Sequence, residues 1–490
     1  MKKGAILFIT PPYHAGVVEV AGRWVPLHLV YLAGAVRAAG FEAAIYDAMT
    51  KDVGHAEIEA RIRQMRPRYV ATSAITCTFP DALAVMETAK RVDPSITTIM
   101  GGIHPTFMHE EVFTLSAHVD FVVVGEGEKT VVELLDALEG GGDPLAVAGV
   151  ATREGAGPQR PLMEPGELDA LAKAWDLLDW DDYRYFVIPD SRLGAVDTSR
   201  GCNKDCSFCS QRRFWRQSWR GRSPESVVAD METLKREHGV NVVLFTDDYP
   251  TYDRQRWERL LELLLLRNLG SYILMETRVE DILRDRAILK EYRRAGIIHV
   301  YVGTESTDQA TLDLFKKDVK VEDAKEAIGL LNDHGIITET SMILGLPAET
   351  RDSIERTLRL AREYNPDFCH FLAIAPWPYA DMYEELAPHV AVRDYRRYNL
   401  IDPVVKPRAM ELDDINSAIV DCYRRFYMDK LHEVVRIGDR FKRDYLLFSM
   451  KLMMTNSFLV EKIGGLGEMP EEVKRHLAIL REPEKEVTGL

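Results

Sequence analysis

The cysteines of this 490-residue chain are unevenly spaced. Three of them, Cys202, Cys206 and Cys209, form a Cys-x3-Cys-x2-Cys segment, and the other three are distant in sequence. Thiolates bind iron–sulfur clusters and zinc, but a zinc site needs a fourth ligand, and no nearby Cys or His supplies one at a usual spacing. Three ligands around a four-iron cubane leave one iron open to a substrate. We therefore predict a [4Fe–4S] cluster on these three residues.

Further polar residues and one glycine follow apolar runs later in the chain. Carboxylates there suit a cationic amine, and an arginine suits a carboxylate, although surface salt bridges and strand packing are alternative explanations. The candidates are Asp247 and Asp248 after NVVLFT, Glu276 and Arg278 in SYILMETR, Glu305 in YVGTES, and Gly345 in MILGLP.

Basic and aromatic residues alternate just beyond the cysteines, from 212 to 220. Such a segment can stack on nucleobases, or it can form a loop over the cluster or a pocket for a flat or anionic substrate. The net charge of −15 and the pI near 5.5 argue against a general nucleic-acid surface. We therefore regard nucleic acid as an unlikely partner and a small-molecule substrate as the expectation.

The elements that position these residues form two α/β series. From 194 to about 375, six apolar runs alternate with helical segments, which predicts a partial (β/α)6 TIM-type barrel with its active face at the carboxyl ends of the strands. Before residue 145, five shorter runs alternate with helices, which predicts a doubly wound, Rossmann-like parallel sheet.

Four loops at the strand ends of this first series, at 10–16, 73–78, 101–106 and 125–127, are rich in small residues. They let a large flat ligand or a phosphate approach the backbone, although ordinary turn chemistry explains any one of them alone. The candidate ligand-binding residues there are Thr10, Pro11, Ser73, Thr76, Gly101, Gly102, His104, Gly125 and Glu126, and the first loop extends to Gly16.

We divide the chain into a domain at 1–145, a linker at 146–190, a barrel at 191–380 and a helical region at 381–490. The helical region carries an apolar stripe that favours core packing, with a second possibility that it lines a pocket for a hydrophobic ligand; the stripe comprises Phe448, Met450, Met453, Met454 and Leu459. The amino terminus lacks a signal-peptide cleavage site, and no apolar run is long enough to span a bilayer, so we expect a cytoplasmic protein without a transmembrane segment.

The cysteine spacing, with Phe208 before the last cysteine, resembles the signature of the radical S-adenosylmethionine superfamily. The resemblance covers about 194 to 375. It implies that the open iron binds the amino and carboxylate groups of S-adenosylmethionine, whose reductive cleavage releases a 5′-deoxyadenosyl radical. It further implies that Asp247 and Asp248 replace a Gly-Gly-Glu segment that binds the amine, and that Arg278 pairs with the carboxylate. Glu305 would bind the ribose or substrate, and Gly345 would lie beside the adenine.

A doubly wound domain before such a barrel is similar to the cobalamin-binding branch of that superfamily. The chain lacks the Asp-x-His-x-x-Gly motif of other cobalamin proteins, which implies binding without a histidine on cobalt. Within the branch, the chain most resembles the anaerobic magnesium-protoporphyrin IX monomethyl ester oxidative cyclase group. The resemblance rests on Arg200-Gly-Cys202, Cys209-Ser-Gln211, Phe214-Trp-Arg216, Gly101-Gly-Ile-His-Pro-Thr-Phe107, Pro376-Trp-Pro378, Tyr398-Asn399 and Arg424-Arg-Phe-Tyr-Met428.

These resemblances imply an enzyme with three cofactors, the cluster, S-adenosylmethionine and cobalamin, that activates an inert C–H bond for methyl transfer or oxidative cyclisation. The expected substrate is hydrophobic or tetrapyrrole-like, with Trp215, Trp377 and Tyr379 as candidate contacts, and the expected reductant is a donor such as flavodoxin or ferredoxin. Two alternatives remain: a radical enzyme that modifies RNA or a peptide, and a non-catalytic corrinoid or electron-transfer protein.

Overall fold

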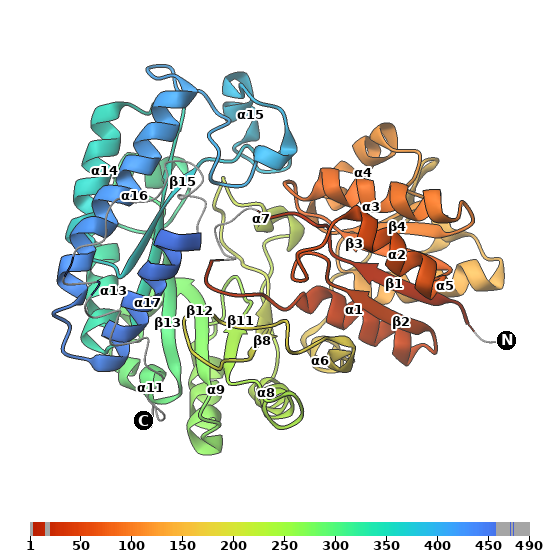
Figure 1. The fold of residues 1–490 in the computed structure, drawn as a ribbon, viewed down its shortest axis with the longest axis horizontal. Helices are drawn as coiled ribbons and strands as arrows, with labels where there is room; N and C mark the ends of the chain where they lie inside the picture. The colour runs from red at the N-terminus through yellow and green to blue at the C-terminus, as the bar shows by residue number, and fades with distance from the viewer. Residues whose placement is uncertain (1–2, 15–19, 457–470, 472–473, 475–490) are drawn as a thin grey trace.

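The computed structural model describes residues 3–14, 20–456, 471 and 474. Figure 1 shows two α/β units side by side, with the amino-terminal unit on the right and the barrel on the left. Gly16 and Leu459, which we named from the sequence, lie outside the described residues. Both units carry their parallel strands in the centre and their helices outside, as predicted.

The amino-terminal sheet has the strand order β2-β1-β3-β4-β5-β6-β7, and its first five strands are parallel. The alternating elements are β1 (Ala5–Ile9), α1 (Leu27–Ala38), β2 (Glu42–Tyr46), α2 (His55–Met65), β3 (Tyr69–Ser73), α3 (Phe79–Val92), β4 (Thr97–Gly101), α4 (Ile103–Leu115), β5 (Phe121–Val123) and α5 (Gly127–Gly140). The doubly wound prediction is confirmed.

Both faces of this sheet are covered, which explains why its strands are apolar throughout. Helices α1 and α5 pack on one face around Phe8, Val36 and Leu134, and α2 and α3 pack on the other around Leu7 and Met86. The strand order reverses between β1 and β3. In open α/β sheets ligands bind at such a reversal, beyond the carboxyl ends of the strands.

The segment at 146–190 extends the first sheet as well as linking the two units. Strands β6 (Val150–Thr152) and β7 (Gly155–Ala156) add antiparallel to the β5 edge. The chain then runs through α6 (Pro165–Asp169) to the barrel, and Tyr185 forms an isolated bridge to Gly22. The sequence shows no regular alternation here because these two strands are very short.

The second sheet contains six parallel strands in the order β15-β14-β13-β12-β11-β8, without pairing between β15 and β8. The strands are β8 (Leu193–Val196), β11 (Val242–Phe245), β12 (Tyr272–Arg278), β13 (Ile297–Gly303), β14 (Ile337–Leu344) and β15 (Phe368–Ala373). The outer helices are α8 (Pro224–His238), α9 (Arg254–Arg267), α10 (Val279–Arg284), α11 (Leu289–Arg294), α12 (Gln309–Leu314), α13 (Val321–Asp333) and α14 (Arg351–Tyr364). This open, partial barrel is the architecture that the sequence predicts.

Beyond the barrel, α15 (Tyr383–Leu386) is short, and α16 (Leu412–Val434) and α17 (Arg440–Asn456) are long. Helix α16 packs against β15 and α14, and α17 packs against α16. Met450 is buried in the barrel core, and Met453 lines the barrel cavity, so the predicted apolar stripe serves both purposes. Among the described residues, no helix has the length and apolar character needed to cross a membrane.

Candidate active site

The three candidate cysteines lie on the loop that leaves the carboxyl end of the barrel. This loop follows β8 and β9 (Ser199–Arg200), and it leads into α7 (Gln211–Phe214) and β10 (Arg220–Gly221), which pairs with β9. All three side chains are free thiols. Burial, together with Cys206, raises the pKa of Cys202, and it raises the pKa of Cys209 to about 12. Cys206 is buried, and Cys202 and Cys209 are partly buried, so the loop keeps all three thiols partly away from water.

This donor set fits a [4Fe–4S] cluster. Within the described ranges, no three Cys, His, Asp or Glu side chains converge closely enough to hold one metal ion. A cubane has a different requirement, because it takes one thiolate at each of three separate irons. Cys202, Cys206 and Cys209 would hold it.

Arg278 ends β12 directly beside this loop. Its Nη1 lies 4.0 Å from Cys206 Sγ, and its Nε donates to Glu280 Oε1 at 2.5 Å. The side chain is buried, and its Nη2 has no hydrogen-bond partner in the described part of the chain. A buried guanidinium with a free donor beside three thiols fits the carboxylate of S-adenosylmethionine.

The adjacent residues Asp247 and Asp248 differ in what they contact. Asp247 accepts hydrogen bonds from Thr198, from its backbone N at 2.8 Å and from its Oγ1 at 2.7 Å, and thereby ties β11 to the end of β8. Burial raises the pKa of Asp248 to about 6, and the nearby Trp215 indole opposes this shift. The Asp248 carboxyl acts electrostatically on Cys202 and Cys209. Asp248, which lines the cavity beside Trp215, is thus the carboxyl whose charge acts on the cysteine loop.

Glu276 and Glu305 lie on neighbouring strand ends. Glu305 forms a buried ion pair with Lys317, whose Nζ lies 2.9 Å from Oε1. Burial raises the pKa of Glu276 to about 8, with further contributions from Asp248 and Glu305. Glu276 faces the barrel cavity, whereas much of the charge of Glu305 is neutralised by Lys317.

Gly345 and Phe208, two further candidates, occupy packed positions. The Gly345 backbone N donates to Glu349 Oε2 at 3.2 Å, and φ of Gly345 is +87°, so the residue forms a tight turn after β14. The Phe208 ring lies 4.8 Å from the Phe315 ring. Both residues therefore have packing roles near the carboxyl ends of the barrel strands.

The interior of the barrel is a largely apolar cavity of about 790 Å³, called the barrel chamber below. It is lined by inward side chains of β11 to β15, by α17 and by the loops after β3 and β15. The candidate substrate contacts Trp377 and Tyr379 are among them, whereas Trp215 lines the neighbouring cavity described next. Other apolar and aromatic lining residues are Trp24, Tyr185, Val187, Leu244, Leu274, Tyr301, Phe368, Leu372, Tyr398, Leu452 and Met453.

A second cavity, of about 490 Å³, lies where the amino-terminal sheet meets the barrel. Its mouth is formed by Asp248 and Trp215 and by five of the predicted strand-end residues, Ser73, Gly101, Gly102, Gly125 and Glu126. Its inner part passes between the sheet and helices α1 and α5, where Phe8, Leu29, Leu32, Ile99 and Val131 make it apolar.

This second cavity fits cobalamin, which has a flat ring and an apolar base on a tail. A Cβ built on Gly125 would meet no atom within 4 Å, so this glycine leaves open space at the mouth. A Cβ on Gly102 would lie 2.4 Å from Ala74 O, so that glycine is required for the turn itself. Four of the lining glycines, Gly101, Gly102, Gly125 and Gly127, belong to the amino-terminal domain and let a ligand approach the backbone.

Four other candidates of the amino-terminal domain lie behind these cavities. Thr10 Oγ1 donates to Asp47 Oδ1 at 2.7 Å, and Pro11 is buried. Thr76 Oγ1 lies 2.8 Å from Tyr379 Oη and 3.2 Å from His104 Nδ1. Burial lowers the pKa of His104 to about 4, so this imidazole is neutral and helps to dock the barrel onto the sheet.

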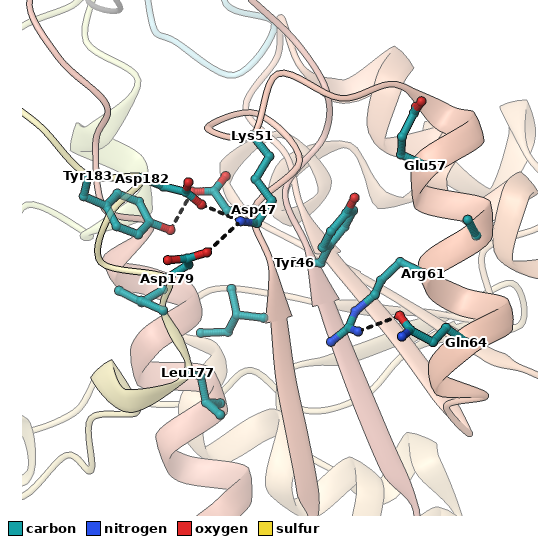
Figure 2. Close-up of a pocket in the computed structure, with 13 residues that line it drawn as sticks. Tyr46, Asp47, Lys51, Glu57, Arg61, Gln64, Leu177, Asp179, Asp182 and Tyr183 are labelled. Atoms are coloured by element: carbon teal, nitrogen blue, oxygen red, sulfur yellow. Dashed lines mark hydrogen bonds and ion pairs between the residues drawn. The ribbon is translucent and has the colours of Figure 1, made fainter.

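A third cavity, of about 640 Å³, lies at the β2 edge of the first sheet and contains none of the predicted residues. Figure 2 shows Lys51 paired with Asp179 and Asp182 there, and Arg61 hydrogen-bonded to Gln64. Lys51 lies 2.5 Å from Asp182 and 3.6 Å from Asp179, and Tyr183 donates to Asp47 at 3.0 Å.

The basic residues beyond the cysteines are also paired within the chain. Arg212 and Arg213 contact Asp381, and Arg220 contacts Glu126. Arg216 donates to Arg160 O at 2.8 Å. The structure thus gives these cations contacts that pack the cluster loop, with Arg213 and Arg216 remaining at the surface.

The sequence interpretation missed one polar group in the barrel chamber. His299, Glu339 and His370 point inward from β13, β14 and β15, and the two histidines contact the two carboxylate oxygens of Glu339. The strand pattern contains part of the signal: His299 alternates with the lining residue Tyr301, and His370 with the lining residues Phe368 and Leu372, which places the two histidines on the interior face of the barrel.

Comparisons with known proteins agree with this geometry. The Radical SAM superfamily model matches residues 196–361, and the B12 binding domain model matches residues 13–135. The anaerobic magnesium-protoporphyrin IX monomethyl ester cyclase of Rubrivivax gelatinosus is 37% identical over 463 residues, which are 92% of this chain and 83% of that protein. The hopanoid C-3 methylase of Methylococcus capsulatus is 26% identical over 423 residues, 86% of this chain and 80% of that one.

The fold is shared with TsrM of Kitasatospora setae, a radical S-adenosylmethionine methyltransferase solved with cobalamin and a [4Fe-4S] cluster bound. The TM-score is 0.67 at 18% identity, over 86% of this chain and 88% of that one. The predicted cofactors, namely the cluster, S-adenosylmethionine and cobalamin, are confirmed, and so is the prediction of an enzyme. This chain therefore belongs to the cobalamin-binding branch of the radical S-adenosylmethionine superfamily.

Proposed function

We propose that the enzyme oxidises and cyclises a large, hydrophobic, tetrapyrrole-like small molecule. The barrel chamber carries this proposal, because its lining contains many aromatic and aliphatic side chains and, among the described residues, neither lysine nor arginine. Such a chamber excludes the phosphates of RNA and favours a flat apolar ring system. The 37% identity to a protein named as a magnesium-protoporphyrin IX monomethyl ester cyclase supports the same substrate class.

The chain's own residues bind and orient the reactants in this proposal. When bound, the cluster and S-adenosylmethionine supply a 5′-deoxyadenosyl radical, and cobalamin supplies methyl-transfer or one-electron chemistry. Arg278 and Asp248 hold the carboxylate and the amine of the methionine group. Trp377 and Tyr379, on the loop after β15, contact the substrate in the chamber. Helix α17, which also lines the chamber, excludes water from it. Glu305 and Gly345 support the nucleoside end.

Two expectations about the cell accompany this proposal. The reductant is a donor such as flavodoxin or ferredoxin, and the enzyme works in the cytoplasm. To test the reductant, the enzyme with its cofactors bound is reduced by each purified donor, and the 5′-deoxyadenosine formed is measured. Cell fractionation with an antibody tests the second.

The test of the reaction uses the anaerobically reconstituted enzyme with magnesium-protoporphyrin IX monomethyl ester and methyl-labelled S-adenosylmethionine. We expect 5′-deoxyadenosine and a product that has lost hydrogen, gained a ring and carries no label, all identified by mass spectrometry. The porphyrin remaining unchanged while 5′-deoxyadenosine forms would contradict the proposed substrate. A sample without cluster absorbance, or without 5′-deoxyadenosine after reduction, would contradict the radical chemistry as well.

Methyl transfer is the second candidate reaction. The observation in its favour is the likeness to a hopanoid methylase over 86% of this chain, together with the shared fold of TsrM. Label found in the product of the same experiment supports methyl transfer and rules out cyclisation as the main reaction.

A further inference from the structure

The largely apolar barrel chamber contains one connected group of polar side chains, on strands β13, β14 and β15. His299 Nε2 lies 2.8 Å from Glu339 Oε2, and His370 Nε2 contacts the other carboxylate oxygen. His299 Nδ1 lies 2.8 Å from Tyr445 Oη, which in turn contacts Tyr185 Oη. We call these five residues the chamber array. Two imidazoles that share one carboxylate inside an apolar cavity cost desolvation energy, which structural packing alone does not require.

One nitrogen of the array is left over. His370 Nε2 is hydrogen-bonded to Glu339 and His299 Nδ1 to Tyr445, whereas His299 Nε2 lies at ion-pair distance from Glu339 without hydrogen-bond geometry. His370 Nδ1 has none among the described residues, and His370 lines the chamber. A histidine that donates one N–H to a carboxylate and turns its other nitrogen toward a cavity has the arrangement of an oriented base.

We propose that His370 accepts a proton from the substrate in the barrel chamber, with Glu339 and His299 as positioning residues. In this step the O–H, N–H or C–H bond of the substrate breaks, its electron pair stays on the substrate, and the proton bonds to His370 Nδ1. The imidazolium that forms is paired with the Glu339 carboxylate, so no further reactant is needed. The inference rests on the proposed function only in the choice of the assay substrate.

The surroundings of the array leave it the main proton acceptor of the chamber. Although burial opposes it, hydrogen bonds from His299 and His370 keep the pKa of Glu339 well below its usual range. Burial raises the pKa of the five tyrosines that face the array, so they remain neutral: Tyr185, Tyr301, Tyr423, Tyr427 and Tyr445. Asp367 is paired with Lys442 at 2.7 Å. Glu276 also lines the chamber, but burial raises its pKa to about 8, so it keeps its own proton at neutral pH.

The first test compares His370→Gln with the wild type on magnesium-protoporphyrin IX monomethyl ester. We expect product formation to fall about 100-fold and the acidic limb of its pH profile to disappear. Formation of 5′-deoxyadenosine in the absence of substrate should stay within about twofold, since Arg278 and the cysteine loop are unchanged. Glu339→Gln should lower turnover and alter the same limb, while His432→Gln, at an exposed position, is the matched control. Unchanged turnover and pH profile, or loss of 5′-deoxyadenosine as well, would overturn the proposal.

The second test needs no substrate and separates this inference from the proposed function. Diethyl pyrocarbonate modifies accessible, unprotonated imidazoles, and peptide mass spectrometry reports each histidine. In the reconstituted enzyme we expect modification of His370, slowed by Leu452→Trp, which fills the chamber, while modification of His432 is unaffected. An unreactive His370 would overturn the proposal even if the porphyrin is turned over. A reactive His370 in an enzyme that ignores the porphyrin would contradict the proposed substrate alone.

Discussion

Arg220 and Glu126 form a buried ion pair across the boundary between the two α/β units, with Nη1 2.8 Å from Oε2. Glu126 occupies the position just before α5 at the mouth of the second cavity, and its other oxygen lies 3.2 Å from Arg200 Nη1. Arg200 and Arg220 belong to the paired strands β9 and β10, which flank the cysteine loop. The pair therefore ties the cysteine loop to the glycine-lined cavity.

Glu126→Gln should destabilise the enzyme strongly. The substitution leaves Arg200 and Arg220 buried beside a neutral amide, and breaking such a pair costs about 3 kcal/mol. We expect a lower urea midpoint and weaker cobalamin binding. Glu225→Gln removes an exposed partner of Arg259 and should leave both quantities unchanged. Equal midpoints for Glu126→Gln and the wild type would show that the units are held together by other contacts.

Cys206→Ala should abolish the cluster. The reconstituted wild type should contain about four irons per chain and absorb in the visible region, whereas the variant should lose both signals and form no 5′-deoxyadenosine. Cys422→Ala also removes a buried thiol, but one on α16, away from the cysteine loop. Full iron content in Cys206→Ala, or loss of iron in Cys422→Ala, would contradict the assignment of the ligands.

The architecture could be predicted from the sequence because the two α/β series have strong periodicity. The strand near residue 5 and the helix that begins at Leu27 are where the apolar pattern predicts them. Strands β6 and β7 could not be predicted, since they are three and two residues long and are defined by pairing with β5 rather than by their own composition.

In the candidate site, the sequence predicts the positions of residues along the strands but not which side chains contact one another. Sequence spacing places Asp247 and Asp248 at one strand end, but only the fold reveals that Asp247 is held by Thr198 while Asp248 faces the cysteines. In the same way, His299 and His370 are 71 positions apart, and their shared contact with Glu339 depends on the register of three strands.

Arg278→Met should weaken binding of S-adenosylmethionine. The substitution removes a buried charged donor that has no partner at Nη2, and one charge-assisted hydrogen bond contributes about 1.5 to 3 kcal/mol. We expect the dissociation constant to rise about 10- to 100-fold in equilibrium dialysis with the reconstituted enzyme, at an unchanged iron content. Arg286→Met removes an exposed arginine paired with Glu326 and is the control. Unaltered affinity in Arg278→Met would place the methionine carboxylate elsewhere.

In the absence of S-adenosylmethionine, Glu276→Gln should stabilise the protein, and this stabilisation should increase as the pH rises. Burial raises the pKa of Glu276 to about 8, above the value of about 4.3 in an unfolded chain. The folded state therefore binds the extra proton, and the free energy of unfolding falls as pH rises from about 4 to 8. The variant lacks this loss, so its stability advantage over the wild type should be larger at pH 8 than at pH 6, by about 2 kcal/mol in the free energy of unfolding, and its melting temperature should shift in the same sense. Glu237→Gln, at the surface, is the control, and a pH-independent difference would contradict the burial of the Glu276 charge.

Gly125→Ala separates cofactor binding from folding. Both Gly125 and Gly40 have positive φ, +78° and +90°, and a Cβ at either would meet no atom within 4 Å. Alanine should therefore cost about 1 kcal/mol of backbone strain at each position. Only Gly125 lines the second cavity, where the added methyl occupies the space for a ligand. We expect similar small shifts of the urea midpoint for the two variants, but a cobalamin dissociation constant raised at least about tenfold in Gly125→Ala alone. Equal affinities in Gly125→Ala and Gly40→Ala would place cobalamin away from the β5 loop.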